Sequence, residues 1–349
     1  MHSFYGSAVA AVALLAARAT AHGIATAMVH WPDGTFYHGY DPSYQYQKPP
    51  PVVIGWGIPN DLTNTFISPS GYATPDIVCH LGATPAGIAA PVNAGDVLEI
   101  QWNKWPASHK GPVLDYLANC NGPCETADKT KLQFFKISEA GLLDAAKNQW
   151  AADELLANNL SWSVRLPSDI APGNYVLRHE MIALHAAGNA NGAQNYPFCF
   201  NLVINGNGTA TPTGIPAVSF YKEKDPGILF DLFTKFTTYV IPGPPLYSDA
   251  LTAAQTKPGA IKATASGVAS YVAPAGGGAA APTRAVRSPA GHAVREAAPA
   301  VETPAGVPNA APAAPAAAEA TVAAVVDQQP AEPLPTTLLT AVLKVKGRA

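Results

Sequence analysis

The sequence predicts an all-β protein, a β-sandwich with long loops and short helices, followed by a disordered tail rich in Ala and Pro. Short runs of strand-forming residues recur through residues 22–249, and Gly, Pro and Asn turn signals separate them. The composition changes near residue 250, beyond which the chain has one aromatic residue, Tyr271, and no Cys. Short strands joined by long Pro- and Gly-rich loops are typical of two packed sheets.

Residues 1–21 are expected to form a secretory signal peptide. The apolar run from Ala8 to Ala17 is too short to span a bilayer, and Ala19-Thr20-Ala21 is a small-residue cleavage pattern. A buried N-terminal helix is the alternative. Cleavage after Ala21 would make His22 the first residue of a secreted, extracellular protein.

Residues 22–249 are predicted to form one domain, which carries all four cysteines and most of the aromatic residues. Segments 139–157 and 227–237 are candidates for short helices. Six runs are expected to form strands: 24–30, 97–102, 132–137, 161–166, 175–182 and 198–204.

Residues 250–349 are predicted to form a low-complexity tail without a further domain. Residues 301–320 alone hold 9 Ala and 4 Pro. Such a segment cannot bury enough apolar surface to offset the entropy lost on ordering, so disorder is expected.

The charge pattern excludes several classes of protein. Only 13% of the residues are charged, which is too few for a coiled coil or a highly charged disordered chain. A pI near 6.3 argues against binding nucleic acid through a basic surface. Residues 22–249 have 12 Lys and Arg against 19 Asp and Glu, so the domain is acidic. We expect neither a nucleic-acid partner nor a membrane partner.

The four cysteines are expected to form two disulfides, because the secretory route is oxidising. Three pairings are possible. Asn121-Gly122-Pro123 is a turn that can bring Cys120 and Cys124 together, which leaves Cys79 for Cys199. A metal site is the alternative reading of the C-x₃-C spacing.

Two sequons predict N-glycosylation of the secreted chain. They are Asn159-Leu160-Ser161 and Asn207-Gly208-Thr209.

A mature N-terminal histidine is a candidate metal ligand. His22 would offer its α-amino group and its ring, and an α-amino group with a pKa near ~8 can lose its proton to a metal at neutral pH. One more imidazole would give three nitrogens in a plane, a geometry that Cu(II) favours. His109 follows the expected strand 97–102 in a loop, a place where ligands often lie. Taken alone, each histidine could equally be an ordinary surface or core residue.

Three polar residues near the end of the domain could surround such a metal. His185, Gln194 and Tyr196 lie within twelve positions and supply a proton donor, an amide and a phenol. A polar loop before a strand, with Tyr196 used for packing, is the alternative.

These motifs, taken in order, resemble the fungal lytic polysaccharide monooxygenases of auxiliary activity family 9, formerly glycoside hydrolase family 61. The resemblance covers essentially all of residues 22–247. It is carried by His22-Gly23, Thr74-Pro75-Asp76-Ile77-Val78-Cys79, Ser108-His109-Lys110-Gly111-Pro112-Val113, Ala171-Pro172-Gly173-Asn174-Tyr175-Val176-Leu177-Arg178-His179-Glu180, Ala183-Leu184-His185, Gly192-Ala193-Gln194-Asn195-Tyr196-Pro197, Asp225-Pro226-Gly227-Ile228 and the run 239–247.

The resemblance implies an immunoglobulin-like β-sandwich and a role for each candidate residue. His22 would bind one copper ion through its amine and ring, and His109 would bind it through its ring. Tyr196 matches an axial tyrosine distant from the copper, and His185 and Gln194 match a pair that hydrogen-bonds the reacting oxygen. The family also pairs its cysteines as argued above, Cys79 with Cys199 and Cys120 with Cys124.

Two aromatic residues match positions that would stack on sugar rings. Tyr46 aligns with a substrate-stacking tyrosine, and Phe233 falls where relatives often have a second tyrosine. Phe233 would keep the stacking plane and lack the hydroxyl. Plain packing is the alternative for both residues.

The resemblance therefore implies copper-dependent oxidative cleavage of cellulose or a related β-glucan, at C1 or C4 of the glucose unit. The enzyme would act as a monomer with a small-molecule or protein electron donor and O₂ or H₂O₂. A glycoside hydrolase is one alternative, but no pair of carboxylates lies in a motif that singles it out. A non-catalytic carbohydrate-binding wall protein, with the tail as a tether, is the other.

Overall fold

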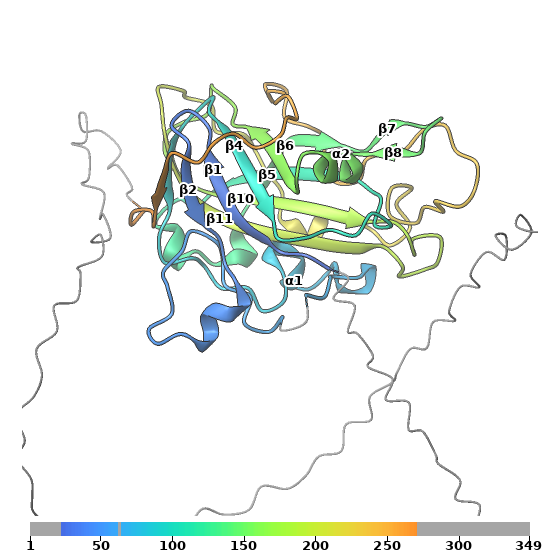
Figure 1. Ribbon diagram of the computed structural model, residues 1–349, viewed down its shortest axis with the longest axis horizontal. Helices are drawn as coiled ribbons and strands as arrows, with labels where there is room; N and C mark the ends of the chain where they lie inside the picture. The colour runs from blue at the N-terminus through green and yellow to red at the C-terminus, as the bar shows by residue number, and fades with distance from the viewer. Residues whose placement is uncertain (1–21, 62–63, 271–349) are drawn as a thin grey trace, which may run out of the picture. The chain divides into compact units, whose positions relative to one another are not determined.

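The computed structural model describes residues 22–61 and 64–270. The predicted signal peptide and residues 271–349 of the predicted tail lie outside the described residues. Within the described part, two five-stranded sheets pack against each other, so the predicted β-sandwich is confirmed (Figure 1).

The first sheet is antiparallel except at one end, where β12 pairs parallel to β2. Its spatial order is β12 (Ala263–Ala265), β2 (Thr35–His38), β1 (Ala25–His30), β4 (Val97–Trp102) and β9 (Ser161–Arg165).

The second sheet is likewise antiparallel except for β3, which runs parallel to β11. Its spatial order is β3 (Ala90–Asn93), β11 (Gln194–Asn205), β10 (Gly173–Ala183), β5 (Val113–Asn119) and β6 (Phe134–Ala140).

Smaller elements connect the sheets. A short hairpin joins β7 (Leu142–Asp144) to β8 (Gln149–Trp150), and the helices are α1 (Asp76–Cys79) and α2 (Ala151–Ala157). Single 3₁₀ turns occupy Pro42–Tyr46, Pro69–Gly71, Cys124–Thr126, Lys129–Lys131 and Ala217–Ser219. The helix expected within 139–157 is therefore present, whereas 227–237 forms turns instead of a helix.

The longest ribbon of the molecule is the β10–β11 pair, which runs in register from Gly173↔Ile204 to Ala183↔Gln194 (Figure 1). Nearly every residue of both strands is buried, because loops and helices cover the second sheet on its outer side. The rigid ribbon fixes where the residues at its end lie, and these include Gln194 and Tyr196.

A buried charged network crosses this ribbon. Arg178 of β10 donates to both carboxylate oxygens of Glu180 at 2.6 and 3.0 Å, and to the carbonyl oxygens of Ile77 and Val78 at 2.8 Å. Glu180 also accepts hydrogen bonds from Asn195 and Tyr221. Both members of the ion pair are fully buried, so their charges are balanced by each other and by these hydrogen bonds.

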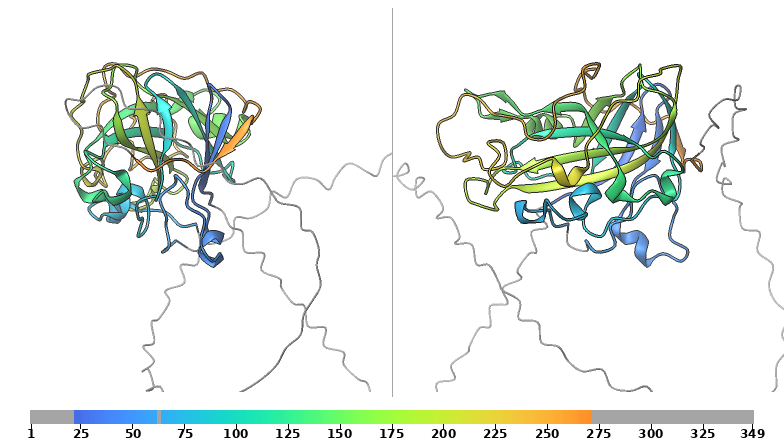
Figure 2. Two further views of the ribbon diagram at one scale, coloured as in Figure 1. Left: turned by 90° about the vertical axis from the view of Figure 1, so that its left-hand side faces the viewer. Right: turned by 180° about the vertical axis from the view of Figure 1, so that it is seen from behind.

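The ordered structure continues past residue 249, where the sequence placed the start of the tail. β12 adds to β2 (Figure 2), and Val268 forms a β-bridge with Ala89. The side-chain amide of Gln255 makes two hydrogen bonds to the backbone of Ser163 in β9, at 2.7 and 2.9 Å. The boundary at residue 249 is therefore too early, because residues 250–270 find backbone partners that their composition does not reveal.

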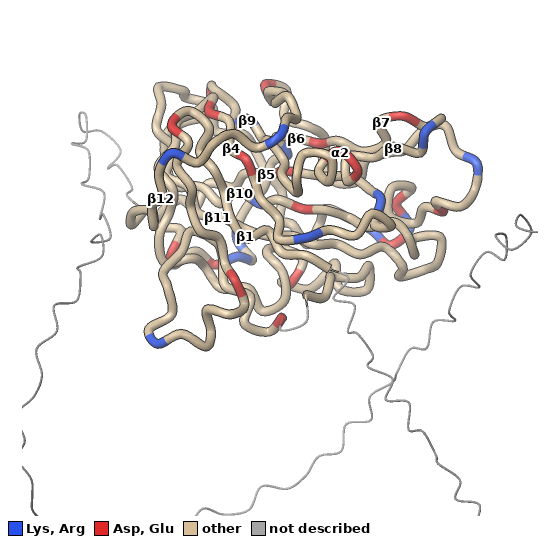
Figure 3. The backbone as a smooth tube through the Cα atoms, viewed as in Figure 1, with Lys and Arg blue, Asp and Glu red and all other residues tan. Residues whose placement is uncertain are grey.

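Acidic and basic residues are scattered over the described backbone, without a basic stripe (Figure 3). Within that part of the chain, every helix is too short or too polar to cross a bilayer.

Both disulfides are present with the predicted pairing, Cys79–Cys199 and Cys120–Cys124. The first joins α1 to β11 across a separation of 120 residues, whereas the second closes a turn of four. The metal alternative for Cys120 and Cys124 is thereby set aside.

The long disulfide is expected to stabilise the fold much more than the short one. On the chain-entropy estimate, the Cys79→Ser/Cys199→Ser variant loses about 5 kcal/mol of unfolding free energy, and Cys120→Ser/Cys124→Ser loses about 2 kcal/mol. Denaturant unfolding of the two double variants and the native protein measures both values. Equal losses would show that loop closure does not set the contribution of these bonds.

Candidate metal centre

Four of the residues predicted to surround a metal lie together. The ring centroid of His22 lies 5.3 Å from that of His109 and 5.3 Å from that of Tyr196. The ring of His185 stacks on that of His109 at 4.0 Å. These residues come from the segment just before β1, the β4–β5 loop, the segment after β10 and the start of β11, so only the folded chain brings them together.

Close backbone packing holds the segment that carries His22. A Cβ at Gly23 would lie 1.8 Å from the carbonyl oxygen of Lys104, so only glycine fits there. Asn103 accepts a hydrogen bond from the Ile24 N–H at 2.9 Å through its side chain, and its own N–H donates to the Ile24 carbonyl at 3.0 Å. These contacts fix the backbone at Ile24, between His22 and the start of β1.

A second asparagine reaches His22 directly. Asn64 donates from Nδ2 to the His22 carbonyl oxygen at 3.2 Å. Sequence reasoning missed Asn64 and Asn103, because a loop asparagine carries no local signal that distinguishes a positioning role from an ordinary turn.

His109 is held by its own loop. Its carbonyl oxygen accepts a hydrogen bond from Trp105 Nε1 at 2.8 Å, and its N–H donates to Pro106 at 3.0 Å. Gly111 lies so close to Ile182 that a Cβ would be 1.9 Å from the Ile182 carbonyl oxygen. The neighbouring Lys110 pairs with Asp153 of α2 at 2.8 Å, which ties this loop to the helix.

Tyr196 and Gln194 lie on one face of β11, because side chains alternate along a strand. The Tyr196 hydroxyl donates to Gln194 Oε1 at 2.8 Å, and its ring contacts that of Trp105 at 5.0 Å between centroids. Burial raises the pKa of Tyr196 well above its usual value, so it stays a neutral phenol. The intervening Asn195 faces the Glu180 network instead.

The electrostatics of the cluster favour neutral imidazoles. Burial, together with the nearby His185 and His22, lowers the pKa of His109 to about 3. Burial also lowers the pKa values of His22 and His185. His109 Nε2 is buried and has no hydrogen-bond partner among the described residues. A neutral imidazole with an unused ring nitrogen is in the form that binds a metal.

The imidazoles of His22 and His109 form a three-donor metal site only if a backbone nitrogen also contributes. Within the described ranges, no three His, Cys, Asp or Glu side chains converge as a metal site. A third donor would have to be the α-amino group of His22, which is free only in a chain that begins there. Two imidazoles and one amine are nitrogen donors, a set that suits copper.

This chain matches one known family of proteins along most of the described domain. The model of Auxiliary Activity family 9 (formerly GH61) matches residues 22–239, which is more than half of the chain. The chain belongs to auxiliary activity family 9. The match begins at His22, the predicted first residue of the mature protein.

Relatives of this family-9 chain are named lytic polysaccharide monooxygenases. Lytic polysaccharide monooxygenase I of Botryotinia fuckeliana is 57% identical over 267 residues, covering 76% of this chain and 98% of the relative. Lytic polysaccharide monooxygenase A of Thermoascus aurantiacus is 52% identical over 220 residues, covering 62% of this chain and 96% of the relative.

A solved structure shares the fold. The extended catalytic domain of H. jecorina LPMO9A superposes with a TM-score of 0.68 at 48% identity, covering 71% of this chain and all of that one. The family-9 chain is therefore an enzyme of the lytic polysaccharide monooxygenase type, and a purely carbohydrate-binding wall protein is set aside.

The two aromatic residues predicted to stack on substrate are exposed in this family-9 fold. Tyr46, at the end of the 3₁₀ turn Pro42–Tyr46, is 77% exposed, and Phe233 is 85% exposed. Neither side chain packs in the core, so plain packing does not account for them. Their contact with substrate stays a prediction.

The two predicted glycosylation sites lie at the surface. Asn159 is exposed in the turn between α2 and β9 with a φ of 60°, a backbone conformation that Asn tolerates, and Asn207 is exposed after β11. Both side chains are open to modification, which stays a prediction.

Proposed function

We propose that this enzyme is secreted, loses residues 1–21, and binds one copper ion through the amine and ring of His22 and the ring of His109. The support is the unused, buried Nε2 of His109 beside the ring of His22, together with the family match that begins at His22. When bound, copper would supply the one-electron chemistry that activates O₂ or H₂O₂ with electrons from an external small-molecule or protein donor.

The surrounding residues would orient the oxygen reactant. The Tyr196 hydroxyl donates a hydrogen bond to Gln194 Oε1. This bond fixes the amide and leaves its NH₂ group to donate to the reactant. His185 stacks on His109 and can carry a proton close to the reacting oxygen. Tyr196, neutral and buried, would close one side of the site without adding a charge.

The proposed substrate is cellulose or a related β-glucan, cleaved after hydroxylation at C1 or C4 of a glucose unit. Exposed Tyr46 and Phe233 would stack on the apolar faces of sugar rings. A flat contact of this kind suits a polysaccharide surface and needs one copy of the chain, so we propose a monomer that acts without nucleic acid or membrane.

Incubation with cellulose and ascorbate is expected to release aldonic-acid or C4-oxidised oligosaccharides, which mass spectrometry identifies. The same enzyme without ascorbate, or stripped of metal by a chelator, should release none. Products with only native reducing ends would show that the chain is a hydrolase, and absence of products from the copper-loaded enzyme would contradict the proposal. The mass pattern also distinguishes C1 from C4 attack.

A further inference from the structure

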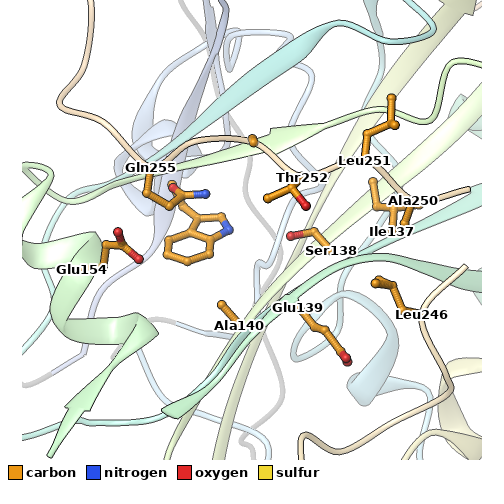
Figure 4. Close-up of a pocket in the computed structure, with 12 residues that line it drawn as sticks. Ile137, Ser138, Glu139, Ala140, Glu154, Leu246, Ala250, Leu251, Thr252 and Gln255 are labelled. Atoms are coloured by element: carbon orange, nitrogen blue, oxygen red, sulfur yellow. The ribbon is translucent and has the colours of Figure 1, made fainter. Parts of the chain in front are cut away.

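A pocket of about 300 Å³ lies away from the histidine cluster and shares no residue with it. Three parts of the chain enclose it (Figure 4): the end of β6 through Ser138, the α2–β9 region through Glu154 and Trp162, and the segment 246–255 through Leu251 and Thr252.

Hydrogen bonds at both ends of 246–255 build this pocket. Tyr247 donates its N–H to the Lys136 carbonyl at 2.8 Å, and its hydroxyl donates to Asp169. At the other end, the Gln255 amide pairs with the backbone of Ser163, next to Trp162. The segment is therefore held across the pocket as a fixed wall.

One buried polar group in the pocket lining has no partner among the described residues. Trp162 is only 2% exposed, and its buried Nε1–H has no hydrogen-bond partner among the described residues. A buried donor without an acceptor destabilises the folded protein, so an acceptor from outside the chain is expected there. Ser138 and Thr252 line the same pocket from different segments of the wall (Figure 4).

The pocket lining suits an uncharged ligand better than an ion. Its two carboxyl groups, Glu139 and Glu154, disfavour an anion. Glu139 points away from Ser138 and Thr252 in Figure 4, and its carboxylate pairs with Lys136 Nζ at 2.6 Å. Glu154 lies on the other side of the pocket, and burial raises its pKa. Glu154 thus offers a hydrogen-bond acceptor. The Trp162 N–H can only donate, so a cation beside it would find no acceptor there.

The complete set of groups matches one class of ligand. The lining offers the Trp162 N–H, the Ser138 and Thr252 hydroxyls, the Gln255 amide and the carboxyl groups of Glu139 and Glu154, beside the apolar side chains of Ile137, Leu246 and Leu251. A sugar ring presents hydroxyls that both donate and accept, beside C–H faces that pack on apolar side chains. The volume is at the lower end of the range for small-molecule sites, which fits one or two rings.

We infer that this pocket binds a pyranose ring of a soluble oligosaccharide, as an accessory carbohydrate site separate from the histidine cluster. A sugar hydroxyl would accept the hydrogen bond from Trp162 Nε1, and the Ser138 and Thr252 hydroxyls would contact the same ring. The inference does not depend on the proposed copper chemistry, because the metal-free protein can be tested.

Titration of the metal-free, ¹⁵N-labelled protein with cellobiose tests the site by NMR. Trp162→Phe identifies the Trp162 indole N–H signal by its loss. We expect that signal to shift saturably, while the Trp105 indole signal stays in place because its N–H is already donated to His109. The Ser138→Ala/Thr252→Val variant should bind cellobiose about tenfold more weakly, as expected for losing two neutral hydrogen bonds.

Thr213→Val is the matched control, since this threonine is exposed and lies outside the pocket. It should bind cellobiose like the native protein. The inference is wrong if the Trp162 signal does not shift, if the double variant binds as tightly as the control, or if glycerol produces the same shift at the same hydroxyl concentration. Failure of this test leaves the copper-dependent products unaffected, so the two proposals are separable.

Discussion

The His22→Ala variant is expected to lose tight copper binding and oxidative cleavage. The substitution removes one imidazole donor of the proposed site and breaks the chelate formed with the α-amine. Loss of a residue that only hydrogen-bonds a ligand costs metal affinity about 10–100-fold, so loss of a ligand should cost more than about 100-fold. Calorimetry with Cu(II) measures the affinity, and oligosaccharide analysis measures the activity.

A variant with one extra alanine ahead of His22 separates the amine from the ring. It keeps the imidazole but moves the free α-amine, so we expect a loss of copper affinity comparable to that of His22→Ala. His38→Ala is the control, because His38 is exposed on β2 and lies outside the cluster. If the extended variant binds copper as tightly as the His38→Ala control, the N-terminal amine is not a ligand.

Replacing Arg178 by methionine is expected to lower the free energy of unfolding by about 3–5 kcal/mol. The substitution leaves Glu180 buried without its charged partner, and removing one member of a buried ion pair costs this much. It also leaves the carbonyl groups of Ile77 and Val78 without their hydrogen bonds from the guanidinium. Urea unfolding measures the change.

Lys110→Met is the matched control for that measurement. Lys110 and Asp153 form an ion pair in which both side chains are partly exposed, so its loss should cost less than about 1 kcal/mol. If the two variants lost similar free energies of unfolding, the buried Arg178–Glu180 pair would not stabilise the fold more than the partly exposed Lys110–Asp153 pair does.

Much of the fold could be predicted because the relevant signals are local. Strands such as 97–102 and 161–166 combine β-forming residues with flanking turns, and the structure contains them nearly as expected. β5 was not predicted, although it lies inside the second sheet between β10 and β6. β12 was missed because Ala263–Ala265 has no strand pattern of its own and depends on β2 for its conformation.

At the site, too, residues in sequence motifs could be predicted, whereas residues that act through tertiary contacts could not. His22, His109, His185 and Tyr196 were named from motifs, and the fold brings their rings together. The residues that hold them could not be named in advance. Asn103 acts on Ile24 across 79 positions in the sequence, a relation that only the sheet creates. Phe233 and Tyr46 are exposed as stacking residues must be, but exposure itself is set by the folded surface.

Residues 250–270 change what the two edges of the first sheet expose. The first sheet would end in β2 on one side and β9 on the other, and a strand at the end of a sheet offers unpaired N–H and C=O groups to other chains. β12 covers β2, and the Gln255 amide occupies the backbone of Ser163 in β9. The edges are thereby shortened: β12, which has three residues, replaces the four-residue β2 as the edge strand, and Gln255 pairs with one residue of β9. A recombinant domain cut at residue 249 would expose the edge of β2 and the Ser163 backbone at once, whereas one cut after residue 270 keeps these groups paired.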